Sequence, residues 1–306
     1  LYSSAASDVY KRQLRYAGRT LFVDGSDVDG LGTLDSPIGS LALATSLSQS
    51  GDVIRVLGDA GQDGDWSTLA DNASYELGFS KLNGQMLADG PSWEIPKGVT
   101  AVIDSGVIFK SRRGAITVGS SHEQIDRSNA ALQVLGVPAM VSVQDDGNGG
   151  YVYQPMIGQS GQEIPGHVYF TSIFDGEKGV DQDPFSFPQE PSAGDWGGIG
   201  FTRELDSERS ERWDNEDRGI FLNIVNYASI EFGGGATLID GRFEDRSALF
   251  VDDSRPTLTN NTIVGNANAA IAVTPDAFEE STYFDALSQT VPHTPDYDLS
   301  LIHISE

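Results

Sequence analysis

The chain has 306 residues, of which 45 are acidic and 19 are basic, so its formal net charge at pH 7 is -26. A charge of this sign repels the phosphates of nucleic acids, and a chain with no cysteine forms neither disulfides nor thiolate metal sites. No apolar run approaches the roughly 18 residues of a membrane span. The 35 glycines and 13 prolines indicate a turn-rich globular chain, which we expect to be monomeric.

The two ends of the chain are interpreted as translated sequencing adapter. Residues 3–13 read SSAASDVYKRQ and residues 299–306 read LSLIHISE, which resemble in-frame translations of one adapter and of its reverse complement. Such scars are excluded from fold reasoning. The genuine protein is then at most residues 14–298, an internal fragment of a longer gene, and residues 1–13 and 299–306 are artefacts.

The first part of the genuine chain predicts a cap that contains a helix. A strand over residues 21–23 precedes an acidic, glycine-rich loop. Residues 35–37, Asp-Ser-Pro, then give a helix start, and the apolar residues that follow have mixed helical spacing. A second strand is predicted over residues 53–57. We assign residues 14–60 to this cap, which would cover the first turn of a coil of strands.

The rest of the chain is a succession of short β-rich bursts. The bursts are too short for helices, and the Gly, Asn, Asp and Pro residues between them allow sharp bends. Two polar insertions, residues 175–194 and 202–218, interrupt the pattern. Strands are predicted at residues 75–79, 99–103, 107–110, 115–118, 131–135, 139–143, 151–153, 167–173, 198–201, 220–222, 229–232, 248–251 and 270–273.

Many short strands of this kind are typical of a sandwich, a barrel or a coil of strands. Four asparagines near Ile263 favour the coil, because stacked turns of a parallel β-helix allow Asn side chains to form hydrogen-bonded ladders. The alternative is that Asn is simply a common turn residue in any fold. These asparagines are Asn260, Asn261, Asn266 and Asn268.

Several segments together carry a resemblance to a known family: SPIGSLALAT, KGVTAVIDSGVIFKSRRGAITVGSS, HVYFTSIFDGEKG, GDWGGIGF, NIVNYASIEFGGG and SRPTLTNNTIVGNANAAI. They resemble the right-handed parallel β-helix proteins of the pectate-lyase-like superfamily, as found in large secreted bacterial polypeptides. The likeness spans residues 21–273. It implies an all-β solenoid over residues 61–275, an irregular or partial turn over 276–298, and an extracellular or cell-surface location. The same fold serves lyases, hydrolases and adhesins, so it does not choose an activity.

Two features are candidates for ligand binding. Lys110, Arg112 and Arg113 form a tight basic cluster in a very acidic chain, which would attract a uronate or sulfate group. The alternative is an ordinary solvated surface. Trp213 lies in the charged stretch ERSERWDNEDRG, which predicts an exposed loop and a platform for stacking a sugar. Trp196, by contrast, is predicted to be buried.

Calcium is the candidate cofactor. Its coordination requires hard oxygen donors at alternating positions, with glycine allowing the loop to wrap. Acidic turns without metal are a common alternative, and neither candidate matches an EF-hand loop. The two places are Asp24, Asp27 and Asp29 before Gly30, and Asp175, Asp181 and Asp183 in the first insertion.

No complete catalytic constellation emerges, and no catalytic residue is assigned. The adjacent Asp252 and Asp253 stand beside Arg255, but neighbours on a strand face opposite sides. We therefore expect a noncatalytic structural or adhesive module of an exported bacterial protein, whose inserted loops bind a polysaccharide, a cell-surface glycan or Ca²⁺. The alternative is a polysaccharide lyase or glycoside hydrolase acting on acidic polysaccharide.

Overall fold

The fold is taken from a computed structural model, which describes residues 18–25, 30–183, 189–203, 205–207, 222–274 and 277, and the strands Ser281–Phe284 and Thr290–His293. Both adapter-like ends lie outside these residues. The regular structure in the described part is mostly β, with one α-helix, α2 (Leu41–Leu47), and a 3-10 turn, η1 (Leu69–Asp71). None of the helical segments described is long and apolar enough to cross a membrane.

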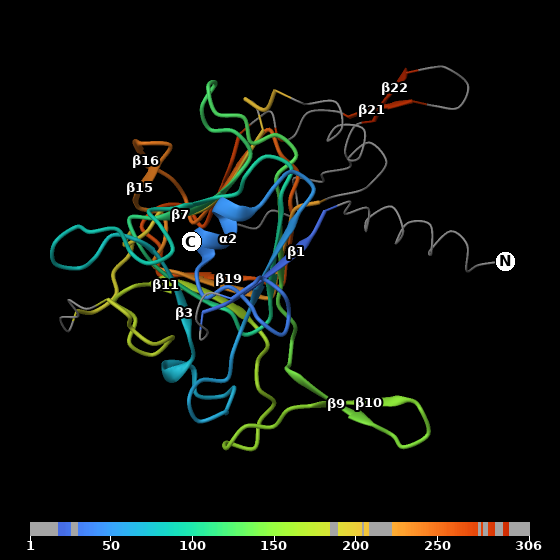
Figure 1. The fold of residues 1–306 in the computed structure, drawn as a ribbon. Helices are drawn as coiled ribbons and strands as arrows, with labels where there is room; N and C mark the ends of the chain where they lie inside the picture. Colours follow the sequence, from blue (N-terminus) through green and yellow to red (C-terminus); the bar gives the residue numbers. More distant parts are fainter. Residues whose placement is uncertain are drawn as a thin grey trace.

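Most strands belong to three parallel sheets, so the prediction of an all-β chain is confirmed at that level (Figure 1). Sheet 1 contains, in spatial order, β1 (Thr20–Asp24), β2 (Val53–Leu57), β5 (Thr100–Asp104), β8 (Ala131–Leu135), β13 (Ile224–Asn226) and β18 (Thr257–Thr259). Sheet 2 contains β3 (Ser74–Gly78), β6 (Ile108–Arg112), β11 (Val168–Ser172), β14 (Ala228–Glu231) and β19 (Thr262–Val264). Sheet 3 contains β4 (Trp93–Glu94), β7 (Ala115–Val118), β12 (Gly198–Thr202), β17 (Leu249–Asp252) and β20 (Ile271–Val273).

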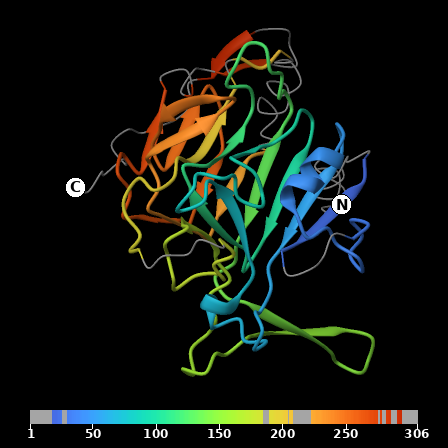
Figure 2. The same ribbon diagram turned by 60° about the vertical axis from the view of Figure 1, so that its left-hand side comes forward.

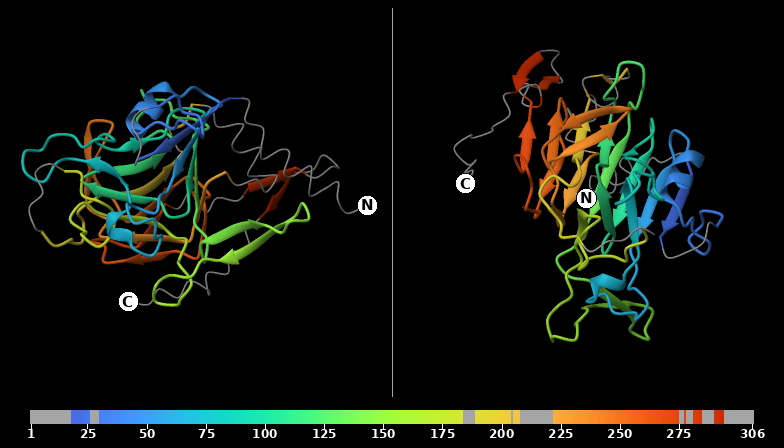
Figure 3. Two further views of the ribbon diagram at one scale, coloured as in Figure 1. Left: turned by 60° about the horizontal axis from the view of Figure 1, so that its bottom comes forward. Right: turned by 90° about the vertical axis from the view of Figure 1, so that its left-hand side faces the viewer.

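The chain supplies strands to the three sheets in rotation. After β2, β3 and β4 it returns to sheet 1 with β5, and the same cycle repeats up to β18, β19 and β20. Within each sheet, neighbouring strands therefore follow one another in chain order. The right-hand panel of Figure 3 shows this as a progression from blue at one end of the molecule to orange at the other. Each strand between the two ends of a sheet contacts the strand one cycle earlier and the strand one cycle later.

The core lies between the three sheets and is built from residues in register. Because side chains alternate across a strand, every second residue faces inward. In sheet 1, Val56, Ile103, Val134 and Val225 occupy matched positions and are all fully buried. Sheet 2 contributes an aromatic row, in which the rings of Tyr75, Phe109 and Phe170 lie 5.4 and 5.3 Å apart between centroids.

Trp196, whose burial was predicted from the sequence, extends this aromatic row. Its ring lies 6.4 Å from that of Phe170, and its side chain is buried. The indole N–H donates to the carbonyl of Glu231 over 2.7 Å, which satisfies the one polar atom of the ring.

The first end of the stack of strands is covered by the helix and by loops (Figure 2). The helix begins at Ser40, whose hydroxyl accepts from the Leu43 amide over 3.3 Å, so the start predicted at residues 35–37 is wrong. The reason is that Ile38 pairs with β1 instead: its amide donates to Phe22 and its carbonyl accepts from Asp24, each over 2.9 Å. Residues 35–37 therefore precede a segment that satisfies the edge of sheet 1.

The described residues also form three antiparallel hairpins. Two interrupt the rotation, β9 (Val141–Asp145) with β10 (Tyr151–Pro155) and β15 (Ala236–Ile239) with β16 (Arg242–Asp245), and one follows it, β21 (Ser281–Phe284) with β22 (Thr290–His293). The expectation that the first pair of runs forms successive sides of a coil is wrong, because they pair with each other. The β9–β10 hairpin projects from the body of the molecule (Figure 1).

The asparagines near Ile263 bond mainly to the backbone of the preceding cycle rather than forming a continuous ladder. Asn261 donates to the carbonyl of Val225 over 2.9 Å and accepts from the Ala228 amide over 3.0 Å. One Asn–Asn contact is present, from Asn260 to Asn226 over 3.1 Å. Asparagine side chains thus fasten one turn of chain to the next at the corners.

Candidate functional site

A polar row crosses the outer face of sheet 2 and marks the candidate site. Glu76 on β3, Lys110 on β6 and Thr171 on β11 occupy matched positions. Their neighbours Tyr75 and Phe109 face the core, so alternation directs the polar row to the opposite face. All three polar side chains are nevertheless buried. Their cover is the loop of residues 173–183, most of which falls in the first predicted insertion, residues 175–194.

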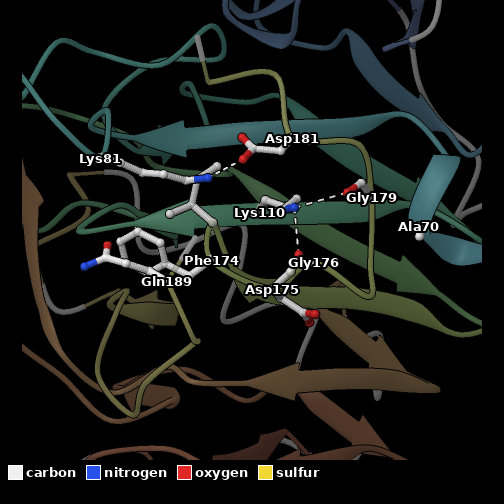
Figure 4. Close-up of a pocket in the computed structure, with 10 residues that line it drawn as sticks. Ala70, Lys81, Lys110, Phe174, Asp175, Gly176, Gly179, Asp181 and Gln189 are labelled. Carbon is white, nitrogen blue, oxygen red and sulfur yellow. Dashed lines mark hydrogen bonds and ion pairs between the residues drawn. The ribbon is translucent and has the colours of Figure 1, made fainter. Parts of the chain in front are cut away.

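Lys110 fastens this 173–183 loop to the sheet. Its Nζ donates to the carbonyl of Asp175 over 2.8 Å and to the carbonyl of Gly179 over 3.1 Å (Figure 4). Only 1% of the residue is exposed, and this burial lowers its pKa, although the neighbouring carboxylates oppose the shift. Lys110 is therefore not a solvated surface charge, and that interpretation is wrong, whereas a ligand-binding role for it stays a prediction.

The other two residues of the predicted basic cluster lie in different surroundings. Arg112 is half-buried, and its Nη1 donates to the carbonyl of Ser80 over 2.9 Å. Arg113 is exposed, adopts a positive φ of 56°, and its amide donates to the carbonyl of Asp195 over 2.7 Å. The three charges are therefore not presented together as one anion-binding surface. A ligand-binding role for Arg112 and Arg113 stays a prediction.

The predicted calcium ligands of the first insertion each have their own protein donors. Asp175 accepts from the Thr171 hydroxyl over 2.7 Å and from Lys178 Nζ over 3.2 Å. Asp181 pairs with Lys81 Nζ. Asp183 accepts from the Lys81 amide over 2.7 Å. These contacts bind the loop to the strand ends beneath it.

Among the residues that the structure describes, no three His, Asp or Glu side chains converge as a metal site would require. Of the second predicted set, Asp24 ends β1 and is half-buried, whereas Asp27 and Asp29 lie outside the described residues. Trp213, the predicted stacking residue, also lies outside them. Calcium and the Trp213 platform therefore stay predictions.

The 173–183 loop separates two hollows. The first, of about 350 Å³, is lined by Lys81, Lys110, Phe174, Asp181 and Gln189 among others. The second, of about 460 Å³, shares the Phe174, Asp175 and Gln189 walls with the first. Lys81 Nζ lies 5.7 Å from the centroid of the Phe174 ring. The first hollow, which we call the loop pocket, thus combines one aromatic ring with ammonium, carboxylate and amide groups.

Glu76, which sequence reasoning missed, lies next to Lys110 in sheet 2 and is bonded to the 173–183 loop. Burial raises its pKa to about 7, while a 2.7 Å hydrogen bond from the Gln182 amide opposes the rise. Its carboxyl therefore exchanges a proton near neutral pH. The alternation of Tyr75, Glu76 and Leu77 in the sequence is enough to predict that Glu76 lies on the outer face of the sheet. It does not predict that the 173–183 loop buries the Glu76 side chain.

The projecting β9–β10 hairpin adds a second feature that the sequence did not single out. Tyr151 and Tyr153 share one face of the hairpin, and 66% of each is exposed. Val143, the partner of Tyr153 across the hairpin, is also exposed. These aromatic side chains are exposed to solvent and do not line the loop pocket.

Asp252 and Asp253 do not act as a pair. Asp252 accepts from the Thr274 hydroxyl over 2.9 Å, whereas the buried Asp253 lies 3.4 Å from Arg203 Nη2. Separate partners of this kind fit the expectation that adjacent strand residues face opposite sides.

Comparison with known proteins adds no assignment: no protein-family model, curated protein or solved structure matches this chain.

Proposed function

We propose that this chain is a right-handed parallel β-helix and serves as a noncatalytic, glycan-binding module of an exported bacterial protein. The support for the architecture is the rotation of successive strands through three parallel sheets, with inward residues kept in register from cycle to cycle. Such a stack is a rigid support on which inserted loops and hairpins can present a binding surface. The exported location rests on the sequence resemblance alone.

The observation that carries the binding proposal is the composition of the loop pocket. Sugar rings present C–H faces that pack on an aromatic ring, and hydroxyl groups that bond to fixed polar groups. Phe174 supplies the ring, while Asp181 and Gln189 supply polar atoms beside it. Lys110 holds the loop, and Lys81 is held by Asp181, so these groups are placed before a ligand arrives.

The pocket favours a neutral glycan over a uronate or sulfate. Its two ammonium groups are engaged by backbone carbonyls and by Asp181, so neither is free to pair with an added anion. The net charge of -26 also repels an acidic polymer at long range. Acidic polysaccharide is thus the weaker choice, contrary to the role expected of Lys110.

Binding can be tested by calorimetric titration with neutral and acidic oligosaccharides. We expect heat with a neutral ligand, and an affinity at least about tenfold lower in Lys81→Ala, because Asp181 then loses the charged hydrogen bond, of about 1.5–3 kcal/mol, that holds it in the loop pocket. Lys97→Ala is the matched control, since Lys97 pairs with Asp126 over 2.7 Å away from the pocket. Equal affinity in the two variants would contradict the assignment of the loop pocket.

A second candidate function, cleavage of acidic polysaccharide, is favoured by Glu76 alone. A buried acid with a pKa near 7 is the kind of group that general acid catalysis uses. Incubation with pectin and alginate, followed by assays for reducing ends and for unsaturated uronate absorbance, separates the two functions. We expect no turnover. Turnover that Glu76→Gln abolishes would show that the chain is an enzyme and would contradict the proposal of a noncatalytic binding module.

A further inference from the structure

The loop between β2 and β3, residues 58–73, carries four aspartates and no basic residue. It reads GDAGQDGDWSTLADNA, and no Lys or Arg occurs between Arg55 and Lys81. Within the part of the chain that the structure describes, none of these four carboxylates forms an ion pair. We call this segment the aspartate loop. Its uncompensated charge attracts cations, but acidic turns without a bound ion are also common.

Two neighbouring side chains near the end of the aspartate loop have buried polar atoms without partners. Asn72 is fully buried, and neither its Oδ1 nor its Nδ2 has a hydrogen-bond partner. The Oδ1 of Asp71 is also buried without a donor, whereas its Oδ2 accepts from the amides of Gln62 and Asp63 over 3.0 and 3.2 Å. Unpartnered buried oxygens of this kind cost free energy and are rare in folded proteins. They therefore indicate a ligand that supplies positive charge.

These oxygens lie beside Gly61, together with a second carboxylate. Gly61 has a positive φ of 66°, and a methyl group on it would lie 2.7 Å from Oδ2 of Asp71 and 2.8 Å from Oδ1 of Asn72. The carboxylate of Asp59 accepts from the amide of Gly61, and from the amide of Ala73 over 2.8 Å. Asp59, Asp71 and Asn72 thus bring side-chain oxygens close to one glycine, where a larger residue has neither the room nor the backbone conformation.

We propose that Asp59, Asp71 and Asn72 bind a calcium ion. Ca²⁺ takes about six to eight oxygen ligands from carboxylates, amide side chains, backbone carbonyls and waters. Two carboxylates and one amide oxygen fit this mixed set, which does not depend on the convergence of three acidic side chains that the described residues lack. Mg²⁺ fits less well, because it demands a near-octahedral shell and gives up its waters reluctantly. A buried water, the other possible occupant, leaves the carboxylate charge uncompensated.

Bound calcium at this place also supports the loop that covers sheet 2. The carbonyls of Leu69 and Asn72 in the aspartate loop accept from the amides of Gly179 and Val180, each over 2.8 Å. Ala70, which lies between them in the chain, lines the loop pocket. The ion site is separate from the aspartates of the 173–183 loop that the sequence predicted as calcium ligands. The inference does not rest on the proposed glycan binding, because its test measures only ion binding and melting.

Calorimetric titration of the chelator-treated full chain with CaCl₂, together with thermal denaturation, tests the proposal. We expect a dissociation constant of about 1 mM or lower. The melting temperature should rise by at least about 2 °C when Ca²⁺ is at about ten times this constant. MgCl₂ at the same concentration is the control for general screening of the charge of -26, and its effect should be smaller. No heat with CaCl₂, or an equal rise with MgCl₂, overturns the proposal.

A charge-removing variant locates the ion. Asp71→Asn keeps an oxygen that can accept from the loop amides but removes the charge, so the affinity for Ca²⁺ should fall at least about tenfold. Asp146→Asn is the matched control, because Asp146 also accepts from two backbone amides, those of Asn148 and Gly150, but lies in the exposed β9–β10 hairpin. This control should bind Ca²⁺ as the parent chain does. Equal affinities in the two variants overturn the assignment.

A second variant, Asn72→Leu, separates ion binding from a purely structural role of the side chain. Asn72 has no side-chain partner within the protein, so leucine, which is of similar size, should leave the melting temperature without Ca²⁺ unchanged or higher. The rise on adding Ca²⁺ should disappear, because one ligand oxygen is gone. A lower melting temperature without Ca²⁺, combined with an undiminished rise on adding it, would show that Asn72 serves packing alone and overturns the proposal.

Discussion

The two ends of the stack of strands solve the same problem in different ways. At the first end the chain covers its own edges: residues 30–38 bond to β1, and the indole N–H of Trp93 on β4 donates to Thr45 of helix α2 over 3.1 Å. Asp89 accepts from the amides of Leu41 in α2 and Glu76 in β3, each over 2.8 Å. At the last end no comparable cover is present among the described residues, apart from Ala277, which is buried against the core.

The difference shows what a parallel stack needs beyond its repeating interior. Each middle strand has a neighbour on both sides, so its hydrogen bonds and its inward side chain are satisfied without special devices. Terminal strands lack one neighbour among the residues that the structure describes. The first end therefore uses a helix, a buried carboxylate and a loop, whereas the described strands of the last end, within residues 257–274, contain no charged residue. The cover at the first end includes the buried carboxyl of Asp89. Burial raises the pKa of this group to about 6, although the two backbone amides that donate to it oppose the rise.

The largest effect is expected from removing apolar volume at the covered end. Leu41 is fully buried between helix α2 and the core, so Leu41→Ala should lower the free energy of unfolding by about 2–5 kcal/mol. Urea denaturation measures this. Leu43→Ala, on the partly buried side of the same helix, is the matched control and should lose much less. Equal losses would mean that the helix is not a cover for the core.

A smaller effect, of opposite sign, is expected from Glu76 on the edge strand β3. Its folded pKa of about 7 lies above the ordinary value of 4.5, so the folded protein retains a proton that the unfolded chain has lost between these values. Its contribution to stability is therefore complete below about pH 4.5 and is lost as the pH rises through about 7. Glu76→Gln keeps the oxygen that accepts from Gln182, and removes the charge.

We expect Glu76→Gln to stabilise the protein at pH 8 by up to about 3 kcal/mol, which is the pKa difference at 1.36 kcal/mol per unit. The gain should vanish at pH 4. Thermal denaturation of both proteins across this range provides the measurement. A gain that is independent of pH would show that the carboxyl is not the titrating group.

The smallest effect is expected at the open end. Val273→Ala removes two methyl groups from a side chain that is already 39% exposed, so the free energy of unfolding should fall by less than about 1 kcal/mol in urea denaturation. Val251→Ala, one cycle earlier in the same row, changes a buried side chain and should cost more. Equal losses in the two variants would contradict the difference between the two cycles.

The sequence predicted the strands of the middle cycles closely. β7 and β8 begin and end where the aliphatic bursts do, at Ala115–Val118 and Ala131–Leu135, because glycine and polar corners bound them on both sides. Pairing was harder to predict. Alternation with a period of two is the same in parallel and antiparallel strands, so the β9–β10 hairpin was not distinguished from a further cycle.

The candidate site was predictable only in part. One pocket is lined by residues from two different predictions: Lys110, which was predicted to bind an anion, and Asp175 and Asp181, which were predicted to bind calcium. Their partners are residues distant in sequence, as in Lys81 with Asp181, and no local pattern indicates such a pair. Burial by the 173–183 loop then decides the protonation of Glu76, which depends on tertiary packing rather than on residue type.

Engineered cross-links test the parallel stack most directly, since the chain has no cysteine of its own to interfere. Val102 on β5 and Gln133 on β8 are matched positions in sheet 1, and a cysteine at each should lie within disulfide distance. We predict rapid disulfide formation in the Val102→Cys, Gln133→Cys variant and little in Val102→Cys, Leu135→Cys, whose register is shifted by two residues. Absent or equal cross-linking in the two variants would contradict the account.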